Sequence, residues 1–174
     1  IMPDIIHGFL PVFDEDCHVL ILGSFPSVKS RKVEFYYGNK QNRFWPMLGR
    51  YFGEQIGEGA LERRLFVLQH GIALWDIVVS CSIHGSADAS IRNYVLADLN
   101  EILCVAPIQS ILLNGTTAFR LFCEQYSGIA IPYLCLPSTS PANSHYNEQA
   151  WVTALDAVLN GKKKNEVKNG DEKI

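Results

Sequence analysis

Four short apolar runs, separated by segments with helical spacing, constrain the fold of this 174-residue chain more than any other feature. Each run is continuous rather than alternating, which is typical of a parallel strand buried on both faces. The runs cover residues 18–23, 72–79, 108–113 and 132–136. Strands of this kind that alternate with helices predict a layered α/β fold.

Apolar residues recur at helical spacing in five further segments: 44–52, 61–70, 90–105, 116–126 and 147–159. In the third of these, Ser90 is placed to cap a helix whose face carries Ile91, Val95 and Leu99. We therefore predict a three-layer αβα sandwich around a four-stranded parallel sheet. It forms one domain over residues 1–160, followed by a polar tail, 161–174, that is predicted to be disordered.

Composition narrows the class of protein. A net charge of −3 excludes a globally basic nucleic-acid coat protein but allows a local basic groove. No apolar run approaches the ~18 residues that span a bilayer, and the N-terminus lacks the layout of a signal peptide. The five cysteines are widely spaced without a C-x-x-C pair, which argues against a disulfide framework or a zinc site. We expect a cytoplasmic protein without metal, cofactor or membrane contact.

Polar residues concentrate at the ends of the four predicted strands, where ligands bind in parallel α/β sheets. Residues 23–45 (GSFPSVKSRKVEFYYGNKQNRFW) follow the first strand, Asp76 interrupts the second, Asn114 follows the third, and 137–143 (PSTSPAN) follow the fourth. The chain has no Walker lysine, G-x-S-x-G elbow or H-E-x-x-H helix. The aromatic and basic residues interleaved in 23–45 favour a stacked nucleobase whose phosphates are held by cations and by Ser or Asn donors.

In these segments the chain resembles the uracil-DNA glycosylase superfamily, over residues 8–160. GSFPS at 23–27 is similar to the first family motif, G-I-N-P-G in the mismatch-specific members, and KQNRFW at 40–45 to the P-A-N-R-F-W that follows it. GIALWD at 71–76 aligns with the second family strand, and STSPAN at 138–143 with the late motif H-P-S-P-R-N. The resemblance implies a four-stranded αβα fold and hydrolysis of the N-glycosidic bond of a damaged base flipped out of DNA.

Three departures from the family pattern refine this expectation. Phe25 stands where the family has a water-positioning Asn or Asp, Ser138 where it has a His that supports the departing base, and Asp76 where it has a base-reading Asn. The chain is most similar to the hypoxanthine-DNA glycosylase branch, which implies an enzyme that acts on DNA with a deaminated base. We expect a monomer, and a monofunctional reaction because no lysine or cysteine lies where a covalent lyase step would need one. Uracil or xanthine as the main target, and a non-catalytic binder of damaged DNA, are the alternatives.

Asn42 is the candidate for orienting the attacking water, and a helix cap is the alternative role for it. Asn39 is the second candidate, with a role in a turn as its alternative. Phe25 and Phe44 are assigned to base binding, although the spacing of Phe44 equally suits core packing.

Asp76 is assigned to base binding because a carboxylate can accept a hydrogen bond from N1–H of hypoxanthine, whereas O6 needs a donor from elsewhere. The alternative is a structural Asp satisfied by backbone donors. DNA phosphates are assigned to five small polar residues, and for those in the STSP segment at 138–141 a plain turn is the alternative. These are Ser24, Ser27, Ser138, Ser140 and Asn143.

Overall fold

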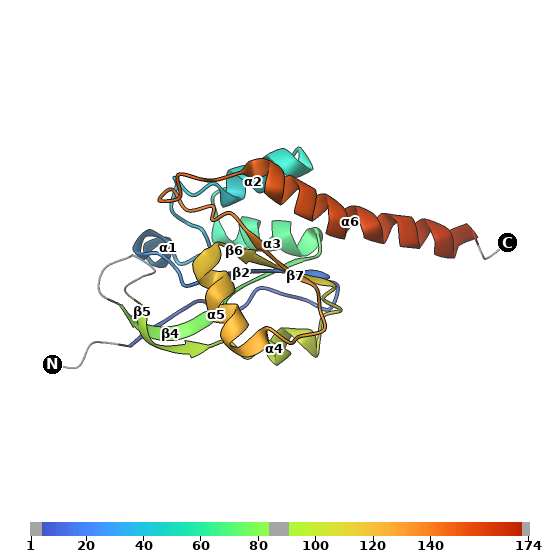
Figure 1. Cartoon of the computed structure of the whole chain (residues 1–174). Helices are drawn as coiled ribbons and strands as arrows, with labels where there is room; N and C mark the ends of the chain where they lie inside the picture. The colour runs from blue at the N-terminus through green and yellow to red at the C-terminus, as the bar shows by residue number, and fades with distance from the viewer. Residues whose placement is uncertain (1–4, 84–90, 172–174) are drawn as a thin grey trace.

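The computed structural model describes residues 5–83 and 91–171, and its centre is a four-stranded parallel sheet (Figure 1). In spatial order the strands are β3 (Ile72–Asp76), β2 (Val19–Gly23), β6 (Ser110–Asn114) and β7 (Tyr133–Leu136). β2 and β3 are buried along their whole length, which explains their continuous apolar sequences. The predicted central sheet is confirmed.

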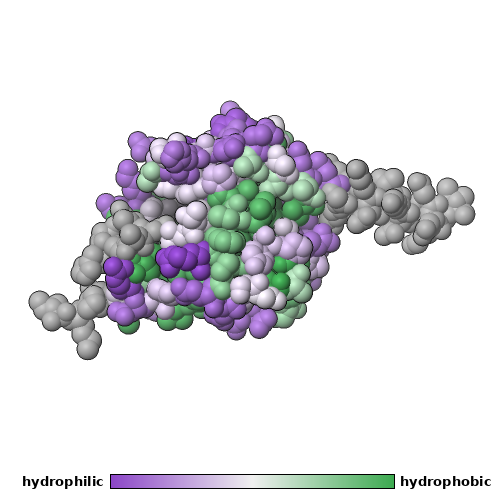
Figure 2. Space-filling view, in the orientation of Figure 1, coloured by the Kyte–Doolittle hydropathy of each residue, from purple (hydrophilic) through white to green (hydrophobic). Residues whose placement is uncertain are grey.

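Helices cover both faces of the sheet, so the predicted three-layer arrangement is also confirmed (Figure 1). One side carries α2 (Phe44–Phe52), α3 (Ala60–Gln69) and α6 (Glu148–Asp171), and the other carries α4 (Asn100–Leu103) and α5 (Thr116–Tyr126). The short helix α1 (Val28–Val33) follows β2. Figure 2 shows an apolar area in the middle of one face, in the region where the edge strand β7 and α5 lie in Figure 1.

A second, antiparallel sheet with the order β1-β4-β5 extends the fold beyond what the sequence predicts. Its strands are β1 (Ile6–His7), β4 (Val78–Ile83) and β5 (Ile91–Leu96). The apolar run at 72–79 therefore belongs to two strands, which Ile77 separates. Its N–H donates to the Gly23 carbonyl and its carbonyl accepts from the Ala97 N–H, both at 2.8 Å. This single residue ties the two sheets together.

The predicted helix over 90–105 is wrong. Residues 91–96 form β5, which pairs antiparallel with β4, and only Asn100–Leu103 is helical. The β-branched Ile91 and Val95 favour extended backbone, and the available partner strand outweighs their helical spacing. Ser90, the predicted cap, lies outside the described residues.

The last helix, α6, extends past the end of the predicted domain. The backbone of residues 161–171 is helical, whereas the sequence predicts disorder there. No proline interrupts the segment, and its Lys and Glu residues are good helix formers, so the helix begun at Glu148 continues through the glycines at 161 and 170. The boundary at residue 160 stays a prediction.

Among the described helices, α6 included, none is long and apolar enough to cross a membrane.

Trp151 links α6 to the loop that follows β7. Its side chain is fully buried, and its ring meets that of Phe44 edge-on with 6.2 Å between the centroids. Its Nε1–H donates to the carbonyl of Pro137 at 2.8 Å. One side chain therefore sets both the packing of the helical layer and the start of a loop at the carboxyl edge of the sheet.

We predict that Trp151→Ala lowers the free energy of unfolding by about 3–5 kcal/mol, because it leaves a large cavity in the core. Trp151→Phe, which keeps a ring but loses the bond to Pro137, should cost less. Denaturant titration measures both. Leu61→Ala is the control, because that side chain is 67% exposed; a Trp151→Ala effect as small as that of the control would contradict the prediction.

Candidate active site

A cavity of about 650 Å³ lies at the carboxyl ends of all four parallel strands. Its wall includes Gly23 of β2, Asp76 of β3, Asn114 of β6 and the residues 136–143 at and after the end of β7. In Figure 1 these ends lie on the left, where α1 and the loops leading into α2 and α6 come together. The direction of strand addition reverses between β2 and β6, and ligands bind at such a point in open α/β sheets.

The structure brings nine of the ten predicted site residues to the wall of this cavity. They are Ser24, Phe25, Ser27, Asn39, Asn42, Asp76, Ser138, Ser140 and Asn143. Phe44 is the exception, because its side chain is fully buried in α2 and its ring lies 4.1 Å from that of Tyr37, centroid to centroid. Phe44 therefore packs in the hydrophobic core, as its helical spacing also allowed. It does not line the cavity, and its ring packs against that of Tyr37, which does.

Asn39 and Asn42 lie in the turn that precedes α2. The Asn42 Oδ1 atom accepts from the Phe44 N–H at 2.9 Å, and the Asn39 Oδ1 atom accepts from the Gln41 N–H at 3.0 Å. The N-cap of α2 is Arg43, so the Asn42 bond lies one residue before the cap position, and Asn39 has the turn role. An amide oxygen has two lone pairs and the amide nitrogen two hydrogens, so each side chain retains the capacity to hold a water molecule in the cavity.

Asp76 lies deep in the cavity and is only 5% exposed. The parallel register of β2 and β3 sets it opposite Gly23. A Cβ atom at position 23 would lie 2.4 Å from Asp76 Oδ1 and 3.1 Å from Tyr37 Oη. A side chain at this position would therefore displace the Asp76 carboxyl group and crowd the Tyr37 hydroxyl, and glycine avoids both.

The loop at 138–143 is shaped by its own polar side chains. The Ser138 Oγ atom accepts from the Ser140 N–H at 3.2 Å, and Asn143 Nδ2 donates to the Ser138 carbonyl at 2.9 Å. Ser140 accepts in the same way from the Ala142 N–H at 3.2 Å. A hydroxyl that accepts such a bond keeps its own proton, so Ser138 and Ser140 can each donate to an anion at the rim.

Ser27 is engaged differently from the serines of the 138–143 loop. Its hydroxyl caps α1 by accepting from the Ser30 N–H, and it also bonds to the Ser30 hydroxyl, both at 3.1 Å. The hydroxyl of Ser27 therefore shapes the wall through the position of α1.

Two buried residues that the sequence analysis left without a role fasten this loop to the sheet. Asn114 Oδ1 accepts from the Thr139 N–H at 2.9 Å, and Asn114 Nδ2 donates to Thr139 Oγ1 at 3.0 Å. The sequence does indicate Asn114, because this residue lies at the end of a predicted strand. The sequence does not indicate Thr139 as its partner, because the pairing depends on how the loop folds back over β6.

Arg43 was also missed in this role, because the sequence suggests a cation that faces phosphate. Its N–H donates to the Thr139 carbonyl at 3.0 Å, and its Nη1 atom donates to the carbonyls of Ser140 and Asn143 at 3.3 and 3.0 Å. Its guanidinium carbon lies 4.8 Å from the centre of the Tyr146 ring. Arg43 therefore joins the turn that holds Asn42 to the loop at 138–143.

The tyrosines beside Asp76 are neutral. Burial, followed by the nearby Asp76 carboxylate, raises the pKa of both Tyr36 and Tyr37 well above the usual range. The cavity therefore offers neutral hydroxyls and amides, the imidazole of His145, and one carboxyl group on its floor. Within residues 5–83 and 91–171, no group of three or more His, Cys, Asp or Glu side chains could hold a metal ion.

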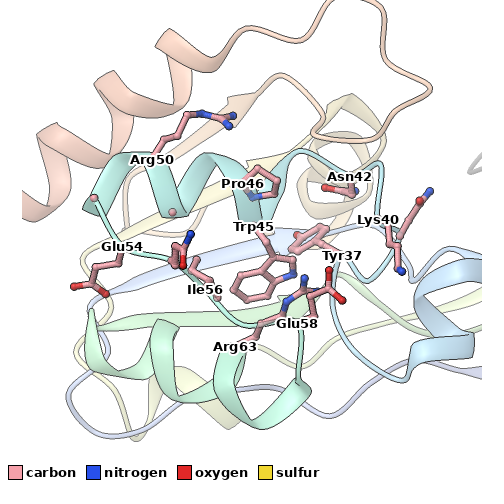
Figure 3. A pocket seen from close by; sticks show the side chains of 14 residues that line it. Tyr37, Lys40, Asn42, Trp45, Pro46, Arg50, Glu54, Ile56, Glu58 and Arg63 are labelled. Atoms are coloured by element: carbon pink, nitrogen blue, oxygen red, sulfur yellow. The ribbon is translucent and has the colours of Figure 1, made fainter.

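A second cavity of about 520 Å³ shares part of its wall with the first. Tyr37, Asn39 and Asn42 line both. Figure 3 shows Trp45 in the middle of this second cavity, with Arg63 close to its indole, and the guanidinium carbon of Arg63 lies 5.1 Å from the ring centre. The turn before α2, which contains Asn39 and Asn42, thus separates the two cavities.

We predict that Arg43→Lys loosens the loop, because a lysine has no planar guanidinium that can lie over Tyr146 while it donates to the carbonyls of Ser140 and Asn143. Backbone amides in 138–146 should exchange hydrogen for deuterium faster, by about tenfold or more, when these charge-assisted bonds are lost. Arg120→Lys is the matched control, because among the described residues Arg120 forms an exposed ion pair with Glu124. Equal exchange in the two variants would show that Arg43 does not hold the loop.

Comparison with known proteins agrees with this geometry. The family model of the uracil DNA glycosylase superfamily matches residues 10–160. A hypoxanthine DNA glycosylase of Methanosarcina acetivorans is 35% identical over 143 residues, which cover 81% of this chain and 90% of the relative. A hypoxanthine DNA glycosylase of Methanosarcina barkeri is 34% identical over 110 residues, or 62% of this chain and 70% of that protein.

The fold has a counterpart among solved structures. The solution NMR structure of a candidate uracil DNA glycosylase from Methanosarcina acetivorans superimposes with a TM-score of 0.77 at 30% identity, covering 89% of this chain and 99% of that one. The family model, the two relatives and this structure agree with one another, and they confirm the family resemblance read from the motifs. The chain belongs to the uracil DNA glycosylase superfamily and is a DNA glycosylase of that family.

Proposed function

We propose that this DNA glycosylase acts mainly on deoxyinosine and releases hypoxanthine. The Asp76 carboxyl group on the cavity floor is the observation that carries the proposal. Hypoxanthine has a hydrogen on N1, which a carboxylate can accept, whereas adenine presents a lone pair at the same position. Both curated relatives described above are hypoxanthine DNA glycosylases, which supports the same substrate.

The base enters the cavity only after it has left the DNA stack. Flipping is easiest where pairing is weak, and deoxyinosine pairs less well than the deoxyadenosine from which it arises. The rings of Phe9, Phe25 and Tyr37 line the cavity, which suits a flat heterocycle. At the rim, Ser138 and Ser140 donate to DNA phosphates, with Ser24 and Asn143 close by. Phosphate contacts fix the position of the strand without reading its sequence.

Bond cleavage proceeds through an oxocarbenium-like sugar. The bond between C1′ and N9 of hypoxanthine breaks, and its electron pair leaves with the base as an anion that takes a proton from solvent. A water held by the Asn42 amide adds to C1′ and loses its proton to solvent. Positioning and electrostatic stabilisation supply the rate enhancement.

The product is a free base and an abasic site in an intact strand. A glycosylase that also cleaves the strand needs an amine nucleophile at C1′. Of the described residues that line the cavity, none is a lysine or a cysteine. This composition supports the monofunctional reaction.

We predict that Asn42→Ala lowers the single-turnover rate of hypoxanthine release by on the order of 100-fold, because the attacking water loses its positioning group. The assay uses an oligonucleotide with one deoxyinosine or one deoxyuridine. Gln41→Ala is the matched control from the same turn, since only its backbone N–H bonds to Asn39. Melting temperatures show that each variant is folded.

The outcomes of this assay separate the alternatives. If hypoxanthine release persists in Asn42→Ala but is lost in Asn39→Ala, then Asn39 is the residue that positions the water. Faster release of uracil than of hypoxanthine makes uracil the main substrate. Tight binding of deoxyinosine DNA without any base release would mean that the protein binds damaged DNA without catalysis, and it would overturn the proposal.

We also predict that Asp76→Asn slows the release of hypoxanthine. The carboxylate accepts a charge-assisted hydrogen bond from N1–H, whereas the amide oxygen of an asparagine accepts only a neutral one. The value of kcat/KM for deoxyinosine should fall by about tenfold or more. An unchanged value would show that Asp76 does not contact the base.

A further inference from the structure

The hydroxyl of Tyr37 is a polar group in the active-site cavity that neither the fold nor the proposed reaction uses. Its oxygen is fully buried and has no hydrogen-bond partner of standard geometry among the described residues. Unsatisfied buried polar groups are rare, and each calls for an explanation, a bound partner among them. Tyr36, the preceding residue, differs in this respect, because its hydroxyl donates to the Leu10 carbonyl at 2.9 Å.

The Tyr37 hydroxyl lies beside the Asp76 carboxyl group. The two oxygens flank one point, the vacant Cβ position of Gly23, at 3.1 and 2.4 Å. Both residues line the cavity. The ring of Tyr37 is backed by Phe44, with 4.1 Å between centroids, and this packing restricts the direction in which the hydroxyl can point.

Asn114 determines which hydrogen-bonding role remains for Tyr37. The Thr139 N–H can only donate, so it fixes Asn114 Oδ1 on its side and orients the amide. The Asn114 Nδ2 atom bonds to Thr139 Oγ1 with one hydrogen and keeps a second. Toward Tyr37 the Asn114 side chain acts as a donor, since it is the one influence that lowers the pKa of this phenol. A phenol oxygen that faces a donor directs its own proton elsewhere.

We propose that Tyr37 and Asp76 together read the lactam edge of the flipped base: Asp76 accepts from the ring N–H, and the Tyr37 hydroxyl donates to the adjacent carbonyl oxygen. For hypoxanthine these groups are N1–H and O6. The inference rests on the proposed function and supplies the donor that O6 requires. It assigns to Tyr37 a specificity-determining contact.

The lactam edge is the chemical mark of deamination. Deamination of adenine or cytosine turns a ring nitrogen with a lone pair next to an amino group into a ring N–H next to a carbonyl. Hypoxanthine and uracil therefore present this edge, and adenine and cytosine do not. Guanine presents it too, so its rejection depends on the cost of extruding a base held by three hydrogen bonds rather than on this pair.

Tyr37→Phe tests the contact, because it removes only the hydroxyl. The substrates are oligonucleotides with deoxyinosine or with 2′-deoxy-6-thioinosine, which keeps N1–H but replaces O6 by sulfur, a weak acceptor. In the wild type kcat/KM should favour deoxyinosine, and in Tyr37→Phe the ratio of the two values should fall by about tenfold, as expected for one lost hydrogen bond. The Tyr37 hydroxyl has no hydrogen bond of standard geometry among the described residues, so its loss should lower the melting temperature less than loss of the Tyr36 hydroxyl does.

Tyr36→Phe is the matched control, because it removes a neighbouring buried hydroxyl that bonds to backbone. It should lower the melting temperature while leaving the substrate ratio at its wild-type value. An unchanged ratio in Tyr37→Phe overturns this inference but leaves the proposed function standing. A wild-type protein that releases no base from deoxyinosine DNA overturns the proposed function itself, so the two failures are distinguishable.

If Tyr37→Phe does not fold, the two substrates test the contact in the wild-type protein alone. Equal kcat/KM for deoxyinosine and 2′-deoxy-6-thioinosine would then also overturn the inference, because no donor would be reading the carbonyl oxygen.

Discussion

The parallel register of β2 with its two neighbours is the constraint on which the active site depends. Leu22 pairs with Trp75 on one side and with Leu113 on the other, so the three strands end level with one another. Gly23 and Asp76 then face each other, and Asn114 ends the adjacent strand β6. A shift of one residue in either pairing would move a side chain to the opposite face of the sheet. The floor of the cavity is thus set by main-chain hydrogen bonds.

The walls of the cavity depend on polar contacts between loops. Arg43 reaches from the turn before α2 to the carbonyls of Ser140 and Asn143, and Thr139 is held by Asn114 at the end of β6. These bonds lie between groups that are buried or half-buried, where a hydrogen bond is electrostatically stronger than in water. The candidate water-positioning residue and the candidate phosphate-binding loop therefore form one unit. A substitution that shifts the turn before α2 should therefore also shift the loop at 138–143, and the reverse should hold.

Much of this architecture could be predicted from the sequence, because buried parallel strands have a distinctive pattern and their carboxyl ends share one edge. The place of Asp76 and of the loop at 138–143 followed from that rule alone. The helix predicted over 90–105 failed because a strand with Ile and Val can also show helical spacing, and only the partner strand β4 decides between the two. Phe44 could not be separated from a base-stacking residue, since a ring in the core and a ring in a wall look alike in a sequence.

The roles of Tyr37 and Arg43 lie beyond sequence reasoning for a different reason. Each depends on contacts with segments far along the chain, Asp76 and Asn114 for Tyr37 and the loop at 138–143 for Arg43. An aromatic or basic residue in a polar segment suggests stacking or phosphate binding, and neither suggestion reveals a buried hydroxyl or an inward-facing guanidinium. The type of a residue indicates which interactions its side chain can form, and the fold determines which of these interactions it forms.

The missing side chain of Gly23 has a consequence for how this enzyme can change its substrate over evolutionary time. A methyl group at position 23 would lie 2.4 Å from Asp76 Oδ1, so it fits only if the side chain at 76 moves or becomes shorter. Mutations at these positions are therefore epistatic, and their order along a lineage matters. Laboratory selection for new base preferences would explore more productive variants from a library that randomises both codons at once than from successive single substitutions.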